Sequence, residues 1–135
     1  MPGFLVDSNI LLDVFTEDPV WSNWSESMLD RCSETHSLYI NPVVYSEISI
    51  GFVRIEELEA VLHESGIALR PVPKEALFLA GKVFLKYRRA KGDKRSPLPD
   101  FYIGAHAAVE SMGLLTRDAA RFRTYFPSLE IICPD

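Results

Sequence analysis

Short apolar runs alternate along this chain with longer segments in which apolar residues recur at helical spacing. The short runs are bounded by polar residues, glycine or proline, which is typical of buried strands. The longer segments have the periodicity of amphipathic helices. Because strands that alternate with helices are joined by right-handed crossovers, this order predicts an α/β fold whose parallel sheet is covered on both faces.

The bounds of these elements follow from the apolar runs and from the residues that begin or end helices. Proline is favoured in the first turn of a helix and glycine just after its end. We expect a central parallel sheet of four to five strands, with 67–72 as a short edge strand; the strands lie at 4–6, 37–41, 67–72, 114–116 and 129–133. We expect helices at 8–15, 19–33, 42–51, 54–65, 73–89 and 100–112, and a short helix that begins within 116–122.

Length and composition favour one globular domain over residues 1–135. Hydrophobic residues make up 47% of the chain and charged residues 24%, which argues against disorder. No apolar run approaches the roughly 20 residues needed to span a bilayer, and the N-terminus lacks the pattern of a signal peptide. We therefore expect a cytoplasmic protein that does not enter a membrane. In that compartment Cys32 and Cys133 are expected to be reduced.

The basic residues are concentrated in one segment. The net charge is −5, yet seven of the fourteen basic residues lie between positions 82 and 95. These seven are Lys82, Lys86, Arg88, Arg89, Lys91, Lys94 and Arg95. Such a segment is either a solvated helix end with a charged loop or a surface that binds a phosphate backbone. Charge alone leaves both interpretations open.

The first expected strand ends on a carboxylate. Asp7 directly follows the apolar run 4–6, and Ser8 or Asn9 is the expected N-cap of the next helix. In open α/β sheets, ligands bind at the carboxyl ends of the strands. Asp7 is therefore a candidate functional residue, with a helix cap as its alternative role.

Three further acids are expected near Asp7. Asp118 follows the 114–116 strand, which we expect beside the first strand, so both carboxylates would face one crevice. Asp100 lies in the first turn of the helix before that strand, where the helix dipole favours an ionised carboxylate. Glu47 lies on an otherwise apolar helix face, and a glutamate in such a position is rarely buried without a partner.

Each of these acids also has a purely structural interpretation. Asp100 would be an ordinary first-turn acid, Asp118 the N-cap of the short helix, and Glu47 a surface residue on a helix of different phase. A coincidence of all of them is harder to accept than any single one. Four carboxylates at close quarters repel one another and suit a hard divalent cation such as Mg²⁺ or Mn²⁺.

Other polar residues are not assigned to this cluster. Three acids are expected on exposed faces or in a loop, namely Asp13, Asp93 and Glu110. The three histidines share no spacing typical of metal ligands, so none is assigned to a metal site.

With these residues in place, the chain resembles a PIN-domain protein, specifically the VapC-type toxin of VapBC toxin–antitoxin modules. The resemblance spans nearly the whole chain. It rests on "FLVDSNILLD", on the isolated Glu47, on "LPDFYIGAHAAV" and on "LLTRDAARFRTYFPSLEIICP". The acids of the family match Asp7, Glu47, Asp100 and Asp118, and its supporting polar positions match Asn9 (or Ser8) and Thr116.

The resemblance implies a three-layer α/β/α fold and a Mg²⁺- or Mn²⁺-dependent endoribonuclease. Asp7, Asp100 and Asp118 would hold the metal, and Glu47 would complete the ligand set or orient the attacking water. The resemblance further implies an RNA substrate, a homodimer and a cognate antitoxin that silences the enzyme.

This context favours the phosphate-binding interpretation of the basic segment, which leads into the helix that carries Asp100. We therefore expect Arg88, Lys94 and Arg95 to bind the RNA backbone.

Other functions remain as alternatives. A PIN-like module could bind nucleic acid or a partner without cutting, although none of the four acids is missing. A structure-specific DNA nuclease would use the same metal chemistry. A flavodoxin-like phospho-acceptor domain would need acids at a middle strand that "SLYIN" lacks, and a dehalogenase-like phosphatase would need a second aspartate where Asn9 lies.

Overall fold

One five-stranded sheet forms the centre of the molecule, of which the computed structural model describes residues 2–90 and 98–134. Every neighbouring pair of strands is parallel, and the order is β3-β2-β1-β4-β5. The strands are β1 (Gly3–Val6), β2 (Ser37–Ile40), β3 (Ile67–Leu69), β4 (Gly113–Leu115) and β5 (Ile131–Ile132). The expected parallel sheet, with its third strand at one edge, is confirmed.

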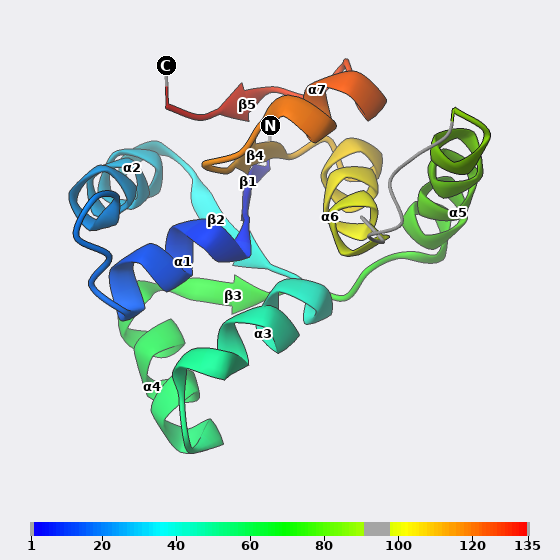
Figure 1. Cartoon of the computed structure of the whole chain (residues 1–135). Coiled ribbons are helices and arrows are strands. Elements are labelled where there is room, and N and C mark those ends of the chain that lie inside the picture. The colour runs from blue at the N-terminus through cyan, green and yellow to red at the C-terminus, as the bar shows by residue number, and fades with distance from the viewer. Residues whose placement is uncertain (1, 91–97, 135) are drawn as a thin grey trace.

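Helices cover both faces of this sheet. In the described part of the chain they are α1 (Ser8–Phe15), α2 (Ser22–Thr35), α3 (Pro42–Ile48), the 3-10 turn η1 (Ser49–Gly51), α4 (Ile55–Ser65), α5 (Lys74–Arg89), α6 (Leu98–Val109) and α7 (Ala120–Tyr125). α1 and α2 lie on one side of the sheet, and α5 and α6 lie on the other (Figure 1). None of the described helices has the length and apolar character needed to cross a membrane. The three-layer α/β/α arrangement expected from the sequence is confirmed.

β1 occupies the middle of the sheet. The chain first adds β2 and β3 on one side of β1, and then returns to add β4 and β5 on the other side. Val6 of β1 is aligned with Leu115 of β4, so the two strands end at the same edge of the sheet. The crevice between the ends of two such strands, where the strand order reverses, is the usual ligand site of open α/β folds.

Aromatic packing fixes α6 against its neighbours. Phe101 is fully buried, and its ring makes edge contacts with the rings of Tyr125 and Phe126. Gly104 allows Phe126 to approach this closely, because a β-carbon at position 104 would lie 2.5 Å from the Phe126 ring. Since Asp100 directly precedes Phe101, the same packing fixes the start of α6.

Several helices differ from their expected bounds: α3 ends at Ile48 and is followed by the 3-10 turn η1, and α4 and α5 each begin one residue later than expected. For α2 and α6 the structure shows the reason. α2 begins at Ser22 rather than at Pro19, because the Asp18 side chain accepts hydrogen bonds from two backbone N–H groups and forms a turn first. α6 ends at Val109, earlier than expected. Ser111 has a φ of 56°, a left-handed conformation that an α-helix does not include.

Candidate functional site

Asp7 lies between the end of β1 and the start of α1. Its backbone N–H donates to the carbonyl of Leu115, which continues the β1–β4 pairing by one residue. Its Oδ1 accepts a hydrogen bond from the Ser8 N–H at 2.8 Å, and its Oδ2 accepts one from the Thr116 hydroxyl at 2.7 Å. Asp7 is thus the N-cap of α1, and the expectation that Ser8 or Asn9 caps this helix is wrong.

The environment of Asp7 disfavours its charged form. Only 4% of the residue is exposed, and this burial raises the pKa of its carboxyl to about 7. The hydrogen bond from Thr116 lowers this pKa, whereas the negative charges of Asp100 and Glu47 raise it further. Both neighbouring side-chain charges therefore act in the same direction, and no ion pair within residues 2–90 and 98–134 involves Asp7.

Glu47 is carried by α3 and is half-buried. Burial raises the pKa of its carboxyl, the Ser8 side chain lowers it, and the charge of Asp100 raises it again. The Oε1 atom is buried and has no hydrogen-bond partner. Buried carboxylate oxygens are normally paired, so this atom marks a place where a partner is missing.

Asp100 lies in the first turn of α6, as expected from the sequence. Its Oδ2 accepts a hydrogen bond from Arg121 Nη1 at 2.8 Å. Burial raises the pKa of Asp100, the contact with Arg121 lowers it, and the charge of Asp118 raises it. Asp100 is therefore repelled by the charge of Asp118 and, at the same time, forms an ion pair with Arg121 of α7.

Asp118 is exposed and follows β4 in the segment that leads to α7. Its backbone N–H donates to the Thr116 hydroxyl oxygen at 3.2 Å. The N-cap of α7 is Ala119, and no side chain caps this helix. The expectation that Asp118 caps the short helix is therefore wrong, because the helix begins one residue later than that role requires.

Thr116 and Asn9 lie between the ends of β1 and β4. The buried Thr116 hydroxyl contacts the Asp7 carboxylate and the Asp118 backbone, and Asn9 Nδ2 lies 3.5 Å from the same oxygen. Asn9 Oδ1 accepts a hydrogen bond from the Arg117 N–H at 3.2 Å. These contacts hold the start of α1 to the 116–118 segment.

The four acids form one electrostatic cluster. The charge of Asp100 raises the pKa of Asp7 and of Glu47, and the charge of Asp118 raises that of Asp100. Across residues 2–90 and 98–134, no group of three or more His, Cys, Asp or Glu side chains is arranged to hold a metal ion. The donor set still suits a hard divalent cation, because all its donors are carboxylate oxygens and Glu47 Oε1 lacks a partner.

Asp13 was expected on an exposed face, and this expectation is wrong. The residue is 3% exposed, and Arg117 contacts both of its carboxylate oxygens at 2.9 Å. The Ser25 hydroxyl donates to Asp13 Oδ2 at 2.8 Å, and the Arg117 guanidinium lies 5.2 Å from the centre of the Trp21 ring. The spacing from Ile10, a core residue three positions earlier in α1, is the signal that would have indicated this burial.

Glu110, also expected on an exposed face, belongs to a partly buried network. Its Oε2 accepts a hydrogen bond from Arg70 Nε at 2.7 Å and lies 3.3 Å from Nε2 of the fully buried His106. Asn41 Nδ2 lies 3.2 Å from His106 Nδ1 and serves as its donor, which leaves the ring proton on Nε2. Burial lowers the pKa of His106, so the ring is neutral near pH 7. This network holds α6 to the end of β2.

The basic segment is described only in part. Arg88 is exposed near the end of α5, and its guanidinium lies 6.0 Å from the centre of the Phe84 ring. Lys94 and Arg95, which were also expected to bind RNA, lie outside the described residues, as does Asp93. α5 packs against α6, so Arg88 belongs to a helix next to the one that carries Asp100.

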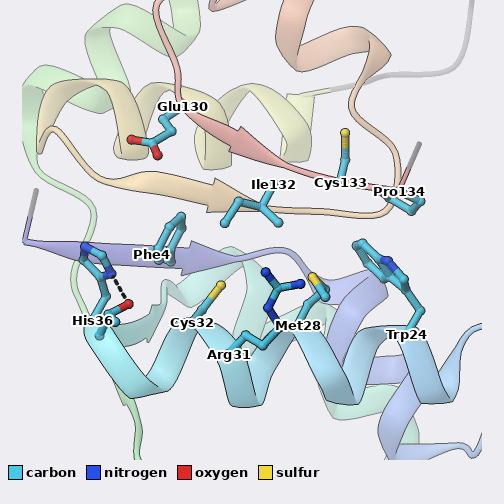
Figure 2. A pocket seen from close by; sticks show the side chains of 11 residues that line it. Phe4, Trp24, Met28, Arg31, Cys32, His36, Glu130, Ile132, Cys133 and Pro134 are labelled. Carbon is cyan, nitrogen blue, oxygen red and sulfur yellow. Dashed lines mark hydrogen bonds between the residues drawn. The ribbon is translucent and has the colours of Figure 1, made fainter.

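A large hollow of about 660 Å³ lies away from the acids, between α2 and the strands β1 and β5 (Figure 2). Its lining combines apolar and charged side chains, and includes Phe4, Trp24, Met28, Arg31, Glu130 and Ile132. None of the four acids lines it. This hollow is therefore separate from the carboxylate cluster.

The family model described as the PIN domain matches residues 4–126 of this sequence. The chain belongs to the PIN domain family. The matched range includes all four acids of the cluster and the whole β1–β4 crevice. The family predicted from the sequence is thus confirmed.

Solved structures share this PIN fold. VapBC2 from Rickettsia felis, bound to a DNA fragment from its promoter, is similar with a TM-score of 0.75 and 18% identity over 98% of each chain. VapBC-1 from nontypeable Haemophilus influenzae gives 0.72 and 14% over 96% of each chain. A toxin–antitoxin complex from Klebsiella pneumoniae gives 0.69 and 18% over 96% of each chain. No curated protein matches this chain in sequence. At these identities the likeness shows the fold.

Proposed function

We propose that this PIN-domain protein is a divalent-metal-dependent endoribonuclease and the toxin of a toxin–antitoxin pair. The observation that carries the proposal is the cluster of four acids at the ends of β1 and β4, in which the pKa of Asp7 is raised to about 7. The acids repel one another, and a bound cation would relieve this repulsion.

In this proposal Asp7, Asp100 and Asp118 hold the ion. Asp7 lies at the end of β1, Asp118 follows β4, and Asp100 begins α6. The charge of Asp100 acts on Asp7 and that of Asp118 acts on Asp100, which supports the assignment of the three to one site. When bound, Mg²⁺ or Mn²⁺ supplies a water of lowered pKa and neutralises charge on the phosphate oxygens. Glu47, whose Oε1 has no partner, completes the ligand set or orients the attacking water.

Polar groups around Asp7 fix its orientation before a substrate arrives. The Ser8 N–H and the Thr116 hydroxyl each hold one of its oxygens, and Asn9 contacts both Thr116 and Arg117. Supporting hydrogen bonds of this kind keep carboxylate ligands in one geometry. We therefore assign Thr116, Asn9 and Ser8 to the support of the catalytic acids.

The surface beside Glu47 suits single-stranded RNA. An open hollow of about 380 Å³ lies between the starts of α3 and α6, and is lined by Pro42, Val43, Ser46, Glu47, Pro99 and Tyr102. The Tyr102 ring offers a surface on which an unpaired base can stack. The phosphate backbone would then extend towards α5, and we assign its binding to Arg88, Lys94 and Arg95.

The comparisons support a protein partner for this chain. Two of the similar structures are VapBC proteins and a third is a toxin–antitoxin complex, so we propose a cognate antitoxin as the partner. We also propose that the chain forms a homodimer, as its resemblance to VapC-type toxins implies.

Cleavage of a pool of structured RNAs tests the proposed activity. The purified protein is incubated with Mg²⁺, with Mn²⁺ or with EDTA, beside the Asp7→Asn and Asp100→Asn variants. Asp30→Asn is the matched control, because Asp30 is an exposed acid on α2. We expect cutting that needs the metal, that both site variants lose, and that the control keeps.

Two results would contradict the proposal. Binding of RNA without cutting, unchanged in the site variants, would indicate a non-catalytic binding module. Cutting of flap DNA in preference to RNA would keep the metal chemistry and change the substrate class.

A further inference from the structure

Arg121 is the residue that the structure adds to the carboxylate cluster. It lies on α7, three positions after Asp118, and its Nη1 is 2.8 Å from Asp100 Oδ2. Within the described part of the chain, this is the one ion pair that includes a member of the four acids. Among the described residues, Arg121 is thus the cation that forms an ion pair with a member of the cluster.

We propose that Arg121 exchanges partners: it binds Asp100 in the resting protein, and it binds the scissile phosphate when the carboxylates hold a divalent cation. This inference rests on the proposed nuclease function. It assigns to Arg121 a role in binding substrate that the sequence did not indicate.

The ion pair between Arg121 and Asp100 can open at little cost in free energy. The two side chains are 41% and 33% exposed, and one nitrogen–oxygen contact joins them. Exposed ion pairs of this kind contribute little to stability, because water and salt compete for both partners. The Arg121 side chain can therefore leave Asp100 without a large loss of free energy.

A phosphate that approaches this cluster needs a cation of the protein. The carboxylates repel a phosphodiester, and one divalent ion does not balance four negative side chains and a phosphate together. A guanidinium presents two parallel N–H donors that match two phosphate oxygens. With Asp100 engaged as a metal ligand, the Arg121 guanidinium that now contacts its Oδ2 would be free to turn to the substrate.

Neighbouring arginines are not placed for this task. Arg117 is held by both oxygens of the buried Asp13. Arg123, on the same helix as Arg121, has its Nη2 3.1 Å from the Cys133 sulfur, away from the acids. Arg123 is therefore a matched control of the same residue type on the same helix.

Two binding measurements with the full chain test the inference. The first is calorimetry of Mn²⁺ binding to the RNA-free protein. The second is binding of the RNA cut in the assay above, with Mn²⁺ present, in a Glu47→Gln background that keeps Asp7, Asp100 and Asp118. Each is made for the parent protein and for the Arg121→Gln, Arg121→Lys and Arg123→Gln variants.

We expect Arg121→Gln to change the two affinities in opposite directions. Removal of the competing guanidinium makes Mn²⁺ binding tighter by about fivefold, the upper range for an exposed pair. Loss of a charge-assisted contact makes RNA binding weaker by about tenfold. Arg121→Lys restores part of the RNA affinity, and Arg123→Gln matches the parent protein in both measurements.

Other outcomes overturn the inference. Tighter Mn²⁺ binding with unchanged RNA binding would mean that Arg121 only competes with the metal. Loss of both affinities would show a structural role. If the parent protein binds Mn²⁺ and RNA and the Arg121→Gln variant behaves identically, the inference about Arg121 is wrong, whereas the proposed function stands. A parent protein that binds neither would overturn the proposed function itself.

Discussion

Two aspartates at the two ends of α1 are equally buried and have opposite surroundings. Asp7 is 4% exposed and Asp13 is 3% exposed. Asp13 meets the Arg117 guanidinium, which contacts both of its oxygens, and a hydroxyl from Ser25. Asp7 meets a hydroxyl, one backbone N–H group and the repulsion of two further acids.

The difference shows that two equally buried carboxylates can have opposite charge surroundings. The protein supplies the cation for Asp13, and the resulting pair ties α1 to the 116–118 segment. For Asp7 the charge is not balanced, so a cation from outside the chain would find a favourable place there. Burial is the same in both cases, and the neighbouring charges make the difference.

The largest expected effect is that of pH on the free energy of unfolding. Burial raises the pKa of Asp7 to about 7 in the folded protein, whereas the ordinary value is 3.8. Protonated Asp7 makes its full contribution to the free energy of unfolding below about pH 4. This contribution is lost as the pH rises through about 7, and the free energy of unfolding of the metal-free protein falls by roughly 4 kcal/mol. Urea unfolding in EDTA at several pH values measures this loss. Asp7→Asn should remove it, and a pH profile unchanged by this substitution would contradict the raised pKa.

Loss of the internal cation of Asp13 has the next largest effect. Arg117→Ala leaves a buried carboxylate with a hydroxyl as its remaining partner, and we expect the free energy of unfolding to fall by about 3 kcal/mol. Urea unfolding measures the change. Arg89→Ala, at an exposed position of α5, is the control and should change stability by less than about 0.5 kcal/mol. A similarly small change for Arg117→Ala would remove the distinction between the two aspartates.

A divalent cation should stabilise the Asp7 region. At a concentration about a hundredfold above its Kd, Mn²⁺ should stabilise the folded protein by about 2.7 kcal/mol at pH 8. The effect should be much smaller at pH 5, where Asp7 keeps its proton and competes with the metal. Thermal unfolding with and without Mn²⁺ measures both values. Equal stabilisation at both pH values, or in the Asp7→Asn variant, would place the ion elsewhere.

The smallest effect concerns the hydroxyl that holds Asp7. Thr116→Val removes the hydrogen bond to Asp7 Oδ2, and we expect a loss of about 1 kcal/mol in stability. Because that bond favours the charged carboxylate, the pKa of Asp7 should rise further. An NMR titration of the Asp7 side chain measures the shift. Thr116→Ser keeps the hydroxyl and should behave as the parent protein.

The sequence predicted the sheet and the places of the four acids because both depend on local pattern. Apolar runs mark strands, and a carboxylate directly after a run, as at Asp7, is set at a strand end. Contacts between side chains are harder to predict, because they join residues that are far apart in the sequence. Asp13 and Arg117 are 104 positions apart, and nothing near Asp13 in the sequence indicates its partner.

The pair of Arg121 and Asp100 was missed for a related reason. Its 21-residue separation spans β4 and the turn before α7, so the contact depends on where α7 begins. The sequence placed the start of that helix one residue too early, with Asp118 as its cap. An error of one residue rotates each side chain of a short helix by about 100°, which is enough to hide such a contact.

The central place of β1 also determines when the carboxylate site can exist. Asp7 is made at the start of synthesis, but the hydroxyl that holds it belongs to Thr116, 109 positions later. At a synthesis rate of roughly 5–20 residues per second, Asp7 waits on the order of 10 s for its partner. An interrupted polypeptide that stops before β4 lacks Thr116 and Asp118, so unfinished chains carry no complete site. The site is thus assembled only when nearly the whole chain has been made.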